Sequence, residues 1–179
     1  MPHFAALVAK DDDTWTTSEI ELEELADIDE VADVMRDASI HDGPVLLFVE
    51  QNDEWFAIMR VDGSGEPRTF ISDARVVPGN ELAATIFEEM PDDVVSLEIP
   101  DVEDFESDDE DATAEEPEEE KPALRADAEP RGATDVLADF GIGSAQLLAM
   151  CAAEGMLPAD VIAAVCERLG CAEDIEVYR

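Results

Sequence analysis

One stretch, residues 43–74, constrains the fold most, because it contains three short apolar runs separated by two turns. The runs cover residues 45–49, 55–61 and 69–71, and they are rich in the β-branched and aromatic residues that favour strands. Asn52 and Asp53 lie in the first turn and Gly63 and Gly65 in the second, and these residue types tolerate the positive φ of hairpin turns. The pattern predicts three consecutive antiparallel strands, a β-meander.

Further elements are predicted on both sides of the meander. Residues 3–9 and 15–20 are short enough for two strands, and the run 45–49, apolar at every position, indicates a strand covered on both faces. A helical face follows the second strand and ends near Ala38, with apolar residues three and four positions apart: Leu25, Ile28, Val31, Ala32 and Met35. A second helix begins after Asn80, a good N-cap residue. We therefore expect an α+β fold over residues 1–90, with the order ββαβββα and a five-stranded antiparallel sheet against which helices pack.

Residues 91–131 interrupt this periodicity. Within them, residues 103–120 contain 12 acidic residues among 18 and no basic residue. Repulsion between like charges and the lack of apolar side chains predict an extended, disordered acidic linker. Residues 94–99, which are mostly apolar, could instead form one last strand or pack on the sheet.

The last part, residues 132–179, is predicted to be a small unit of three helices. Each helix ends at a glycine, Gly141, Gly155 or Gly170, and Pro158 stands in the first turn of the third helix. Thr134 and Ser144 are the candidate caps of the first two. A unit of this size is marginally stable alone, so we expect it to dock either on the sheet domain or on a partner.

The charge of the chain limits its partners. It has 48 acidic and 10 basic residues, a net charge of −38. Such a field repels nucleic acid phosphates and anionic membranes and attracts basic proteins and cations. We therefore expect no direct nucleic acid binding and no membrane binding. The same composition also suits a simpler interpretation, in which the acids keep the protein soluble and reflect a high-GC genome.

The sequence predicts a soluble cytoplasmic protein. Its first apolar run has only six residues and lacks the charged lead of a secretion signal, and no stretch approaches the roughly 20 apolar residues of a membrane span. The three cysteines, Cys151, Cys166 and Cys171, are then expected to be reduced.

We find no complete sequence motif for catalysis, cofactor binding or metal binding, so we predict no catalytic, cofactor-binding or metal-binding residues. The two histidines, His3 and His41, lie in no nucleophile motif, and the pair Cys166 and Cys171 lacks the spacing of a zinc site. Residues 62–66 resemble the start of a calcium loop but lack its closing glutamate. The alternative to a binding protein is an enzyme or small-ligand protein with a pocket between sheet and helices.

Three aromatic residues are candidate partner contacts. Trp55 and Phe56 are adjacent, so on a strand they point to opposite faces of the sheet, and at least one should lie in the core. If the other is exposed, it would be the natural anchor of a protein interface. Phe105 could serve in the same way within the acid run.

Three segments carry a family resemblance. They are DEWFAIMRVDGSGEPRTFISDA in the meander, then DVLADFGI and LPADVIAAVCERLG after the linker. Together they resemble an actinobacterial family of tRNA adenosine deaminase-associated proteins, over residues 3–90 and about 132–176. The resemblance implies association with a tRNA adenosine deaminase and carries no known site.

The chain is not itself the deaminase, because it has neither the H-x-E nor the P-C-x-x-C motif of that zinc enzyme. With no catalytic motif found, we expect a non-enzymatic binding module, and the resemblance implies a tRNA adenosine deaminase as its partner.

Overall fold

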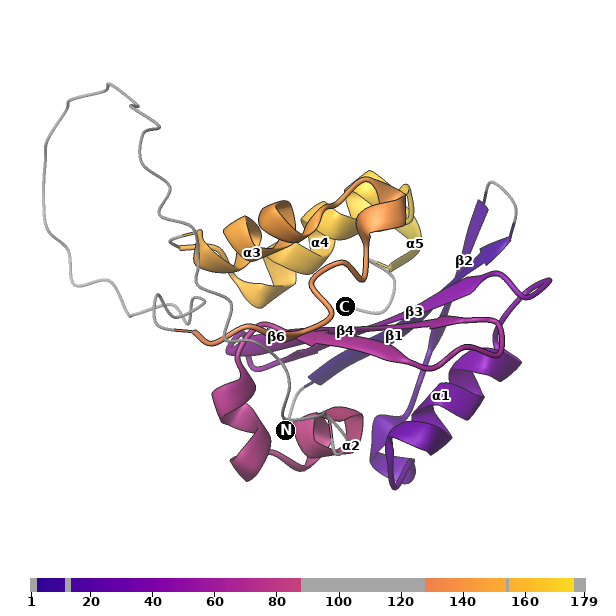
Figure 1. Ribbon diagram of the computed structural model, residues 1–179, viewed down its shortest axis with the longest axis horizontal. Helices are drawn as coiled ribbons and strands as arrows, with labels where there is room; N and C mark the ends of the chain where they lie inside the picture. Colours follow the sequence, from indigo (N-terminus) through magenta and orange to yellow (C-terminus); the bar gives the residue numbers. More distant parts are fainter. Residues whose placement is uncertain (1–2, 12–13, 88–127, 154, 176–179) are drawn as a thin grey trace, which may run out of the picture.

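The structure is a computed structural model that describes residues 3–11, 14–87, 128–153 and 155–175. Its centre is a six-stranded antiparallel sheet with strand order β2-β1-β3-β4-β5-β6. Helices cover both faces of this sheet, with α1 and α2 on one side and α3, α4 and α5 on the other (Figure 1). The predicted α+β class with an antiparallel sheet is confirmed.

The strands are β1 (His3–Asp11), β2 (Thr14–Glu19), β3 (Pro44–Gln51), β4 (Trp55–Asp62), β5 (Arg68–Ile71) and β6 (Arg131–Gly132). The α-helices are α1 (Ile28–Asp37), α2 (Glu81–Phe87), α3 (Ser144–Ala152), α4 (Pro158–Leu169) and α5 (Ala172–Ile175). Three 3₁₀ helices, η1 (Leu22–Glu24), η2 (Ala74–Gly79) and η3 (Ala138–Phe140), complete the order.

The meander is confirmed as β3, β4 and β5, which are neighbours in the sheet. The prediction of five strands was one short, because β6 pairs with β5 through Phe70 and Gly132 and through Ile71 and Arg131. A strand of two residues has no alternation from which it could be recognised, so only the tertiary pairing defines it. Residues 94–99, the other candidate strand, and the acidic linker 103–120 lie outside the described residues.

Alternating side chains of the central strands supply two separate cores. In β3, Leu46 and Phe48 face α3 and α4, whereas Val45, Leu47 and Val49 face α1 and α2. All five are buried. This accounts for the continuous apolar run, since a strand covered on both faces has no polar side to present.

The C-terminal helices pack on the sheet. Val136, Leu147 and Val161 share one hydrophobic core with Phe4 and Phe48 from β1 and β3. The sequence left open whether these helices dock on the sheet domain or on a partner, and the structure shows them docked on the sheet. The boundaries of the sheet domain, linker and helical unit remain a prediction.

Several element ends differ from those expected. Helix α1 begins three residues later than predicted, because the side chain of Asp27 accepts a hydrogen bond from the Glu30 amide at 2.9 Å and caps it. The predicted helix near Thr134 is a turn followed by η3, and Ser144 is the first residue of α3 instead of its cap. Gly170 ends α4 in the left-handed conformation, with φ 83°, as predicted.

Gly43 occupies a backbone position with no room for a side chain. The turn before it places His41 and Asp42 at positive φ, and the Gly43 amide donates to the Ile40 carbonyl at 2.9 Å. A Cβ atom on Gly43 would lie 2.6 Å from the Lys10 carbonyl oxygen and 3.0 Å from that of Ile40. Both neighbours are backbone atoms that a side-chain rotation cannot move, so only glycine fits here.

We therefore expect Gly43→Ala to destabilise the protein by about 1–3 kcal/mol, as overpacking does elsewhere. Gly79→Ala is the matched control, because a Cβ there would meet nothing within 4 Å. It should change the free energy of unfolding by less than about 0.5 kcal/mol. Urea denaturation measures both, and equal effects of the two variants would contradict this account of Gly43.

Candidate functional site

The structure places two of the three predicted contact residues inside the protein. Trp55 and Phe56 point to opposite faces of the sheet as expected, but their side chains are only 1% and 0% exposed. Helices cover both faces of β4, so neither ring is exposed. One of them was expected to contact a partner only if it was exposed, and this condition is not met. Phe105 lies outside the described residues.

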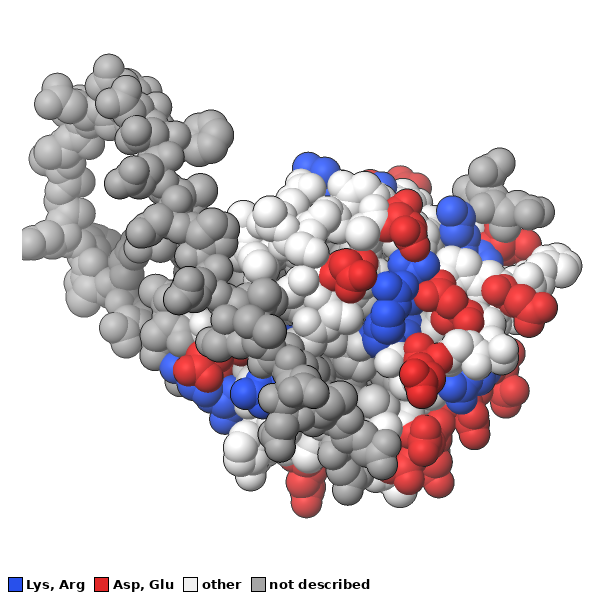
Figure 2. All heavy atoms as spheres, viewed as in Figure 1, with Lys and Arg blue, Asp and Glu red and all other residues white. Residues whose placement is uncertain are grey.

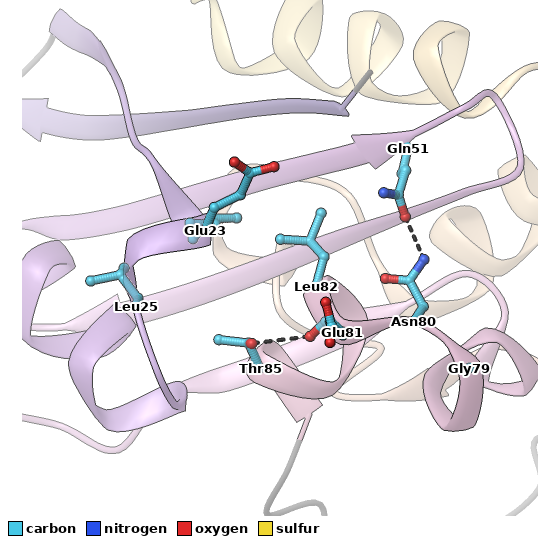
Figure 3. Close-up of a pocket in the computed structure, with 9 residues that line it drawn as sticks. Glu23, Leu25, Gln51, Gly79, Asn80, Glu81, Leu82 and Thr85 are labelled. Carbon is cyan, nitrogen blue, oxygen red and sulfur yellow. Dashed lines mark hydrogen bonds between the residues drawn. The ribbon is translucent and has the colours of Figure 1, made fainter. Parts of the chain in front are cut away.

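A pocket of about 740 Å³ lies where the end of β3 meets η1 and α2 (Figure 3). This volume falls within the range of small-molecule binding sites. The lining residues come from four elements and their connections: Leu22, Glu23, Leu25, Gln51, Gly79, Asn80, Glu81, Leu82 and Thr85. None of these described lining residues is basic.

Hydrogen bonds fix the polar wall of this pocket. The Asn80 side-chain amide donates to Gln51 Oε1, and Asn80 Oδ1 accepts from the Ala83 amide at 3.0 Å. The second bond caps α2, as the sequence predicted for Asn80. Gln51 is only 8% exposed, so its carboxamide is held in place by burial as well as by Asn80. Thr85 Oγ1 donates to the Glu81 carbonyl at 3.0 Å (Figure 3).

A second polar cluster surrounds Arg60 in β4. This arginine is only 6% exposed. Its guanidinium donates to Asp62 Oδ1 at 2.9 Å, to the Val136 carbonyl at 3.1 Å and to Asp139 Oδ2 at 2.9 Å. Burial opposes the charged form, but the hydrogen bonds that Arg60 donates to Asp62 and Asp139 outweigh it and raise the pKa of Arg60. The residue therefore joins the sheet to the segment before α3.

Aromatic contacts continue this junction. The Arg60 guanidinium lies 4.9 Å from the centre of the Phe140 ring, and Lys10 Nζ lies 5.5 Å from the same ring. Trp15 packs edge-on against Phe140, and its Nε1 donates to the Leu169 carbonyl at 2.7 Å. These contacts hold η3 and the end of α4 on the sheet, so we assign the cluster a structural role.

The arginines of the described chain are largely engaged by its own acids. Ion pairs join Arg36 to Asp33, Arg60 to Asp62 and Asp139, Arg68 to Asp62 and Asp135, and Arg75 to Asp73. Figure 2 shows Lys and Arg atoms in a band bordered by Asp and Glu atoms. Basic groups neutralised in this way contribute little to the attraction of phosphates.

Three other kinds of group could take part in chemistry: the cysteines, His41 and clusters of metal-binding side chains. The three cysteines are buried, and burial raises the pKa of the Cys151 thiol to about 12, which keeps it protonated. His41 is exposed, and its Nδ1 lies 3.3 Å from Asp11 Oδ1, away from the pocket lining. Within residues 3–11, 14–87, 128–153 and 155–175, no three His, Cys, Asp or Glu side chains are placed to hold a metal ion.

Over the same described part of the chain, we find no helix with the length and apolar character needed to span a membrane.

Asp73 anchors the chain where it returns to the sheet after the linker. Its side chain accepts hydrogen bonds from the Arg75 guanidinium at 2.7 and 2.9 Å and from the Glu129 amide at 3.4 Å, just before β6. Burial of this carboxyl opposes ionisation, but the hydrogen bonds from Arg75 and Glu129 outweigh it and lower the pKa of Asp73.

These features define the class of protein: an α+β protein with helices on both faces of an antiparallel sheet, a strongly acidic composition and a pocket of mixed polarity. The particular family follows from comparison with known families. The family model described as Rv3753c-like tRNA adenosine deaminase-associated protein matches residues 3–172, and the chain belongs to this family. The resemblance found in the sequence is thereby confirmed. Searches of curated proteins and of solved structures returned no match.

The sequence indicated a pocket between sheet and helices as an alternative, but it did not identify the residues that line it. Of the lining residues, it singled out Asn80 as a helix cap and Leu25 as part of a helical face. Nothing in the local pattern indicates that η1, the end of β3 and α2 converge, because residues 22 and 82 are far apart in the chain. The hydrogen bond between Gln51 and Asn80 joins segments that are distant in the chain, so no periodicity in the sequence predicts it.

The lowered pKa of Asp73 predicts a pH-dependent contribution to stability. A carboxylate whose pKa is lower in the folded state stabilises the protein above its unfolded pKa of about 3.9, and this contribution is lost as the pH falls through the folded value. At pH 7 we expect Asp73→Asn to cost about 1–3 kcal/mol. The difference from the wild type should shrink toward pH 3, as measured by urea unfolding. A difference that does not change with pH would contradict the assignment.

Proposed function

We propose that this protein is a non-enzymatic accessory module that binds a tRNA adenosine deaminase in the cytoplasm. The observation that carries the proposal is membership of a family described as tRNA adenosine deaminase-associated. Association is what that description states, and direct protein binding is the simplest physical form of it.

Charge supports a protein partner of basic character. A protein that binds tRNA neutralises phosphates with Lys and Arg side chains, so its tRNA-facing surface is basic. The present chain carries a net charge of −38 and pairs four of its own arginines internally. An acidic surface can therefore complement the basic surface of a deaminase, with the largest effects on association rate and specificity.

The pocket favours a second candidate function, the binding of a small ligand. Its volume of about 740 Å³ suits such a ligand, and Gln51 and Asn80 provide fixed polar groups. The pocket lies between the sheet and helices, where the alternative derived from the sequence expects one, but His41 is not part of its lining.

The deaminase proposal predicts salt-sensitive binding. The deaminase of the same cell should be enriched on the immobilised protein at about 50 mM salt and much less at about 500 mM, because salt screens charges on exposed surfaces. An unrelated protein of similar net charge serves as the control for non-specific attraction. If the deaminase is not enriched at low salt, the proposal is wrong.

The acid run with Phe105 can be tested in the same assay. Residues 103–120 contribute 12 of the 48 acidic residues. If this segment contacts the deaminase and competes with tRNA, replacing it with an uncharged Gly/Ser segment of equal length should weaken binding and relieve any inhibition of deamination. Unchanged binding and unchanged deaminase kinetics would exclude the segment while leaving the rest of the proposal in place.

A further inference from the structure

We propose that the pocket between η1, β3 and α2 receives an arginine or lysine side chain from the surface of the partner protein. This inference rests on the proposed function, to which it adds a binding site and the chemistry that the site recognises. Three properties of the pocket support it: its apolar walls, its carboxylates and its fixed carboxamides.

The apolar walls match the stem of a long basic side chain. Leu22 of η1 is among the lining residues. Leu25 lies just after η1 and Leu82 lies on α2 (Figure 3). Lysine and arginine bury their methylene groups against apolar surfaces while their charged ends stay at polar groups. A volume of about 740 Å³ also leaves room for neighbouring residues of the partner.

The charged end of such a side chain would find carboxylates on two elements. Glu23 comes from η1 and Glu81 from the first turn of α2, and both line the pocket. Figure 3 shows the two side chains on different sides of the space that the residues enclose. Hydrogen bonds between a cation and a carboxylate are roughly twice as strong as those between neutral groups. The lining therefore favours a cation over an anion such as phosphate.

The carboxamides add directional acceptors. Gln51 Oε1 accepts from Asn80, and Asn80 Oδ1 accepts from the Ala83 amide. Each carbonyl oxygen has two lone pairs, so each can accept a second hydrogen bond. Because these side chains are already held in place, little conformational entropy is lost when a partner binds.

The test compares two double variants of the full-length protein. Glu23→Gln/Glu81→Gln removes both pocket carboxylates, and Glu24→Gln/Glu66→Gln removes two exposed carboxylates outside the lining, so the net charge changes equally. Binding to the deaminase is measured at low salt by calorimetry, and thermal unfolding checks that both variants remain folded. We expect the pocket variant to bind about tenfold more weakly than the wild type and the control to stay within about twofold.

The outcomes separate the two proposals. If the wild type binds the deaminase and the two variants bind it equally well, the pocket assignment is overturned while the proposed function stands. If the wild type does not bind the deaminase, the proposed function is overturned.

A second probe tests the pocket independently of the deaminase. N-acetyl-arginine amide is titrated into ¹⁵N-labelled protein, and we expect shifts at the amides of Glu23, Gln51 and Leu82. These shifts should disappear in the pocket variant and persist in the control. Shifts spread over the acidic surface, or no shifts at these three amides, would overturn the assignment.

Discussion

The fold depends on one constraint: the two central strands are apolar on both faces and must be covered twice. In β4, Phe56 and Ile58 point toward α3 and α4, whereas Trp55 and Ala57 point toward α1 and α2. A sheet covered on one side only would leave one of these rows in water, at a cost of about 25 cal/mol per Å² of exposed apolar surface. The C-terminal helices are therefore required by residues that lie far before them in the chain, in β3 and β4.

Arg60 shows how this arrangement accommodates a charge. It occupies a core-facing position of β4 directly opposite Arg68 in β5, where two like charges would destabilise the strand pair. Asp62 bonds to both arginines, and Asp139 and the Val136 carbonyl complete the partners of Arg60. Two of these partners, Val136 and Asp139, are supplied only when the segment before α3 is docked, which couples the position of the helical layer to the sheet. The pocket lies on the other face, formed by η1, α2 and the end of β3, and is the concave surface to which we assign binding.

The sequence correctly predicted features that depend only on residues close to one another in the chain. The caps at Asn80 and Gly170 and the apolar run of β3 each act within a few residues, so they could be recognised in the sequence. The sixth strand, the burial of both Trp55 and Phe56, and the meeting of Gln51 with Asn80 depend on segments distant in the chain. For the same reason the sequence indicated the family and the acidic character more reliably than the place where a partner binds: of its three candidate contacts, Trp55 and Phe56 are buried and Phe105 lies outside the described residues.

Because one hydrophobic core joins the sheet to the C-terminal helices, we infer that the two form one cooperative structure, which truncation tests. Residues 1–131 alone expose the face of the sheet that α3, α4 and α5 cover in the full chain. We expect this fragment to lose the cooperative urea transition of the full-length protein and to recover it when a peptide of residues 132–179 is added. A fragment that unfolds cooperatively at the midpoint of the full chain, with no effect of the peptide, would show instead that the sheet folds without the C-terminal helices.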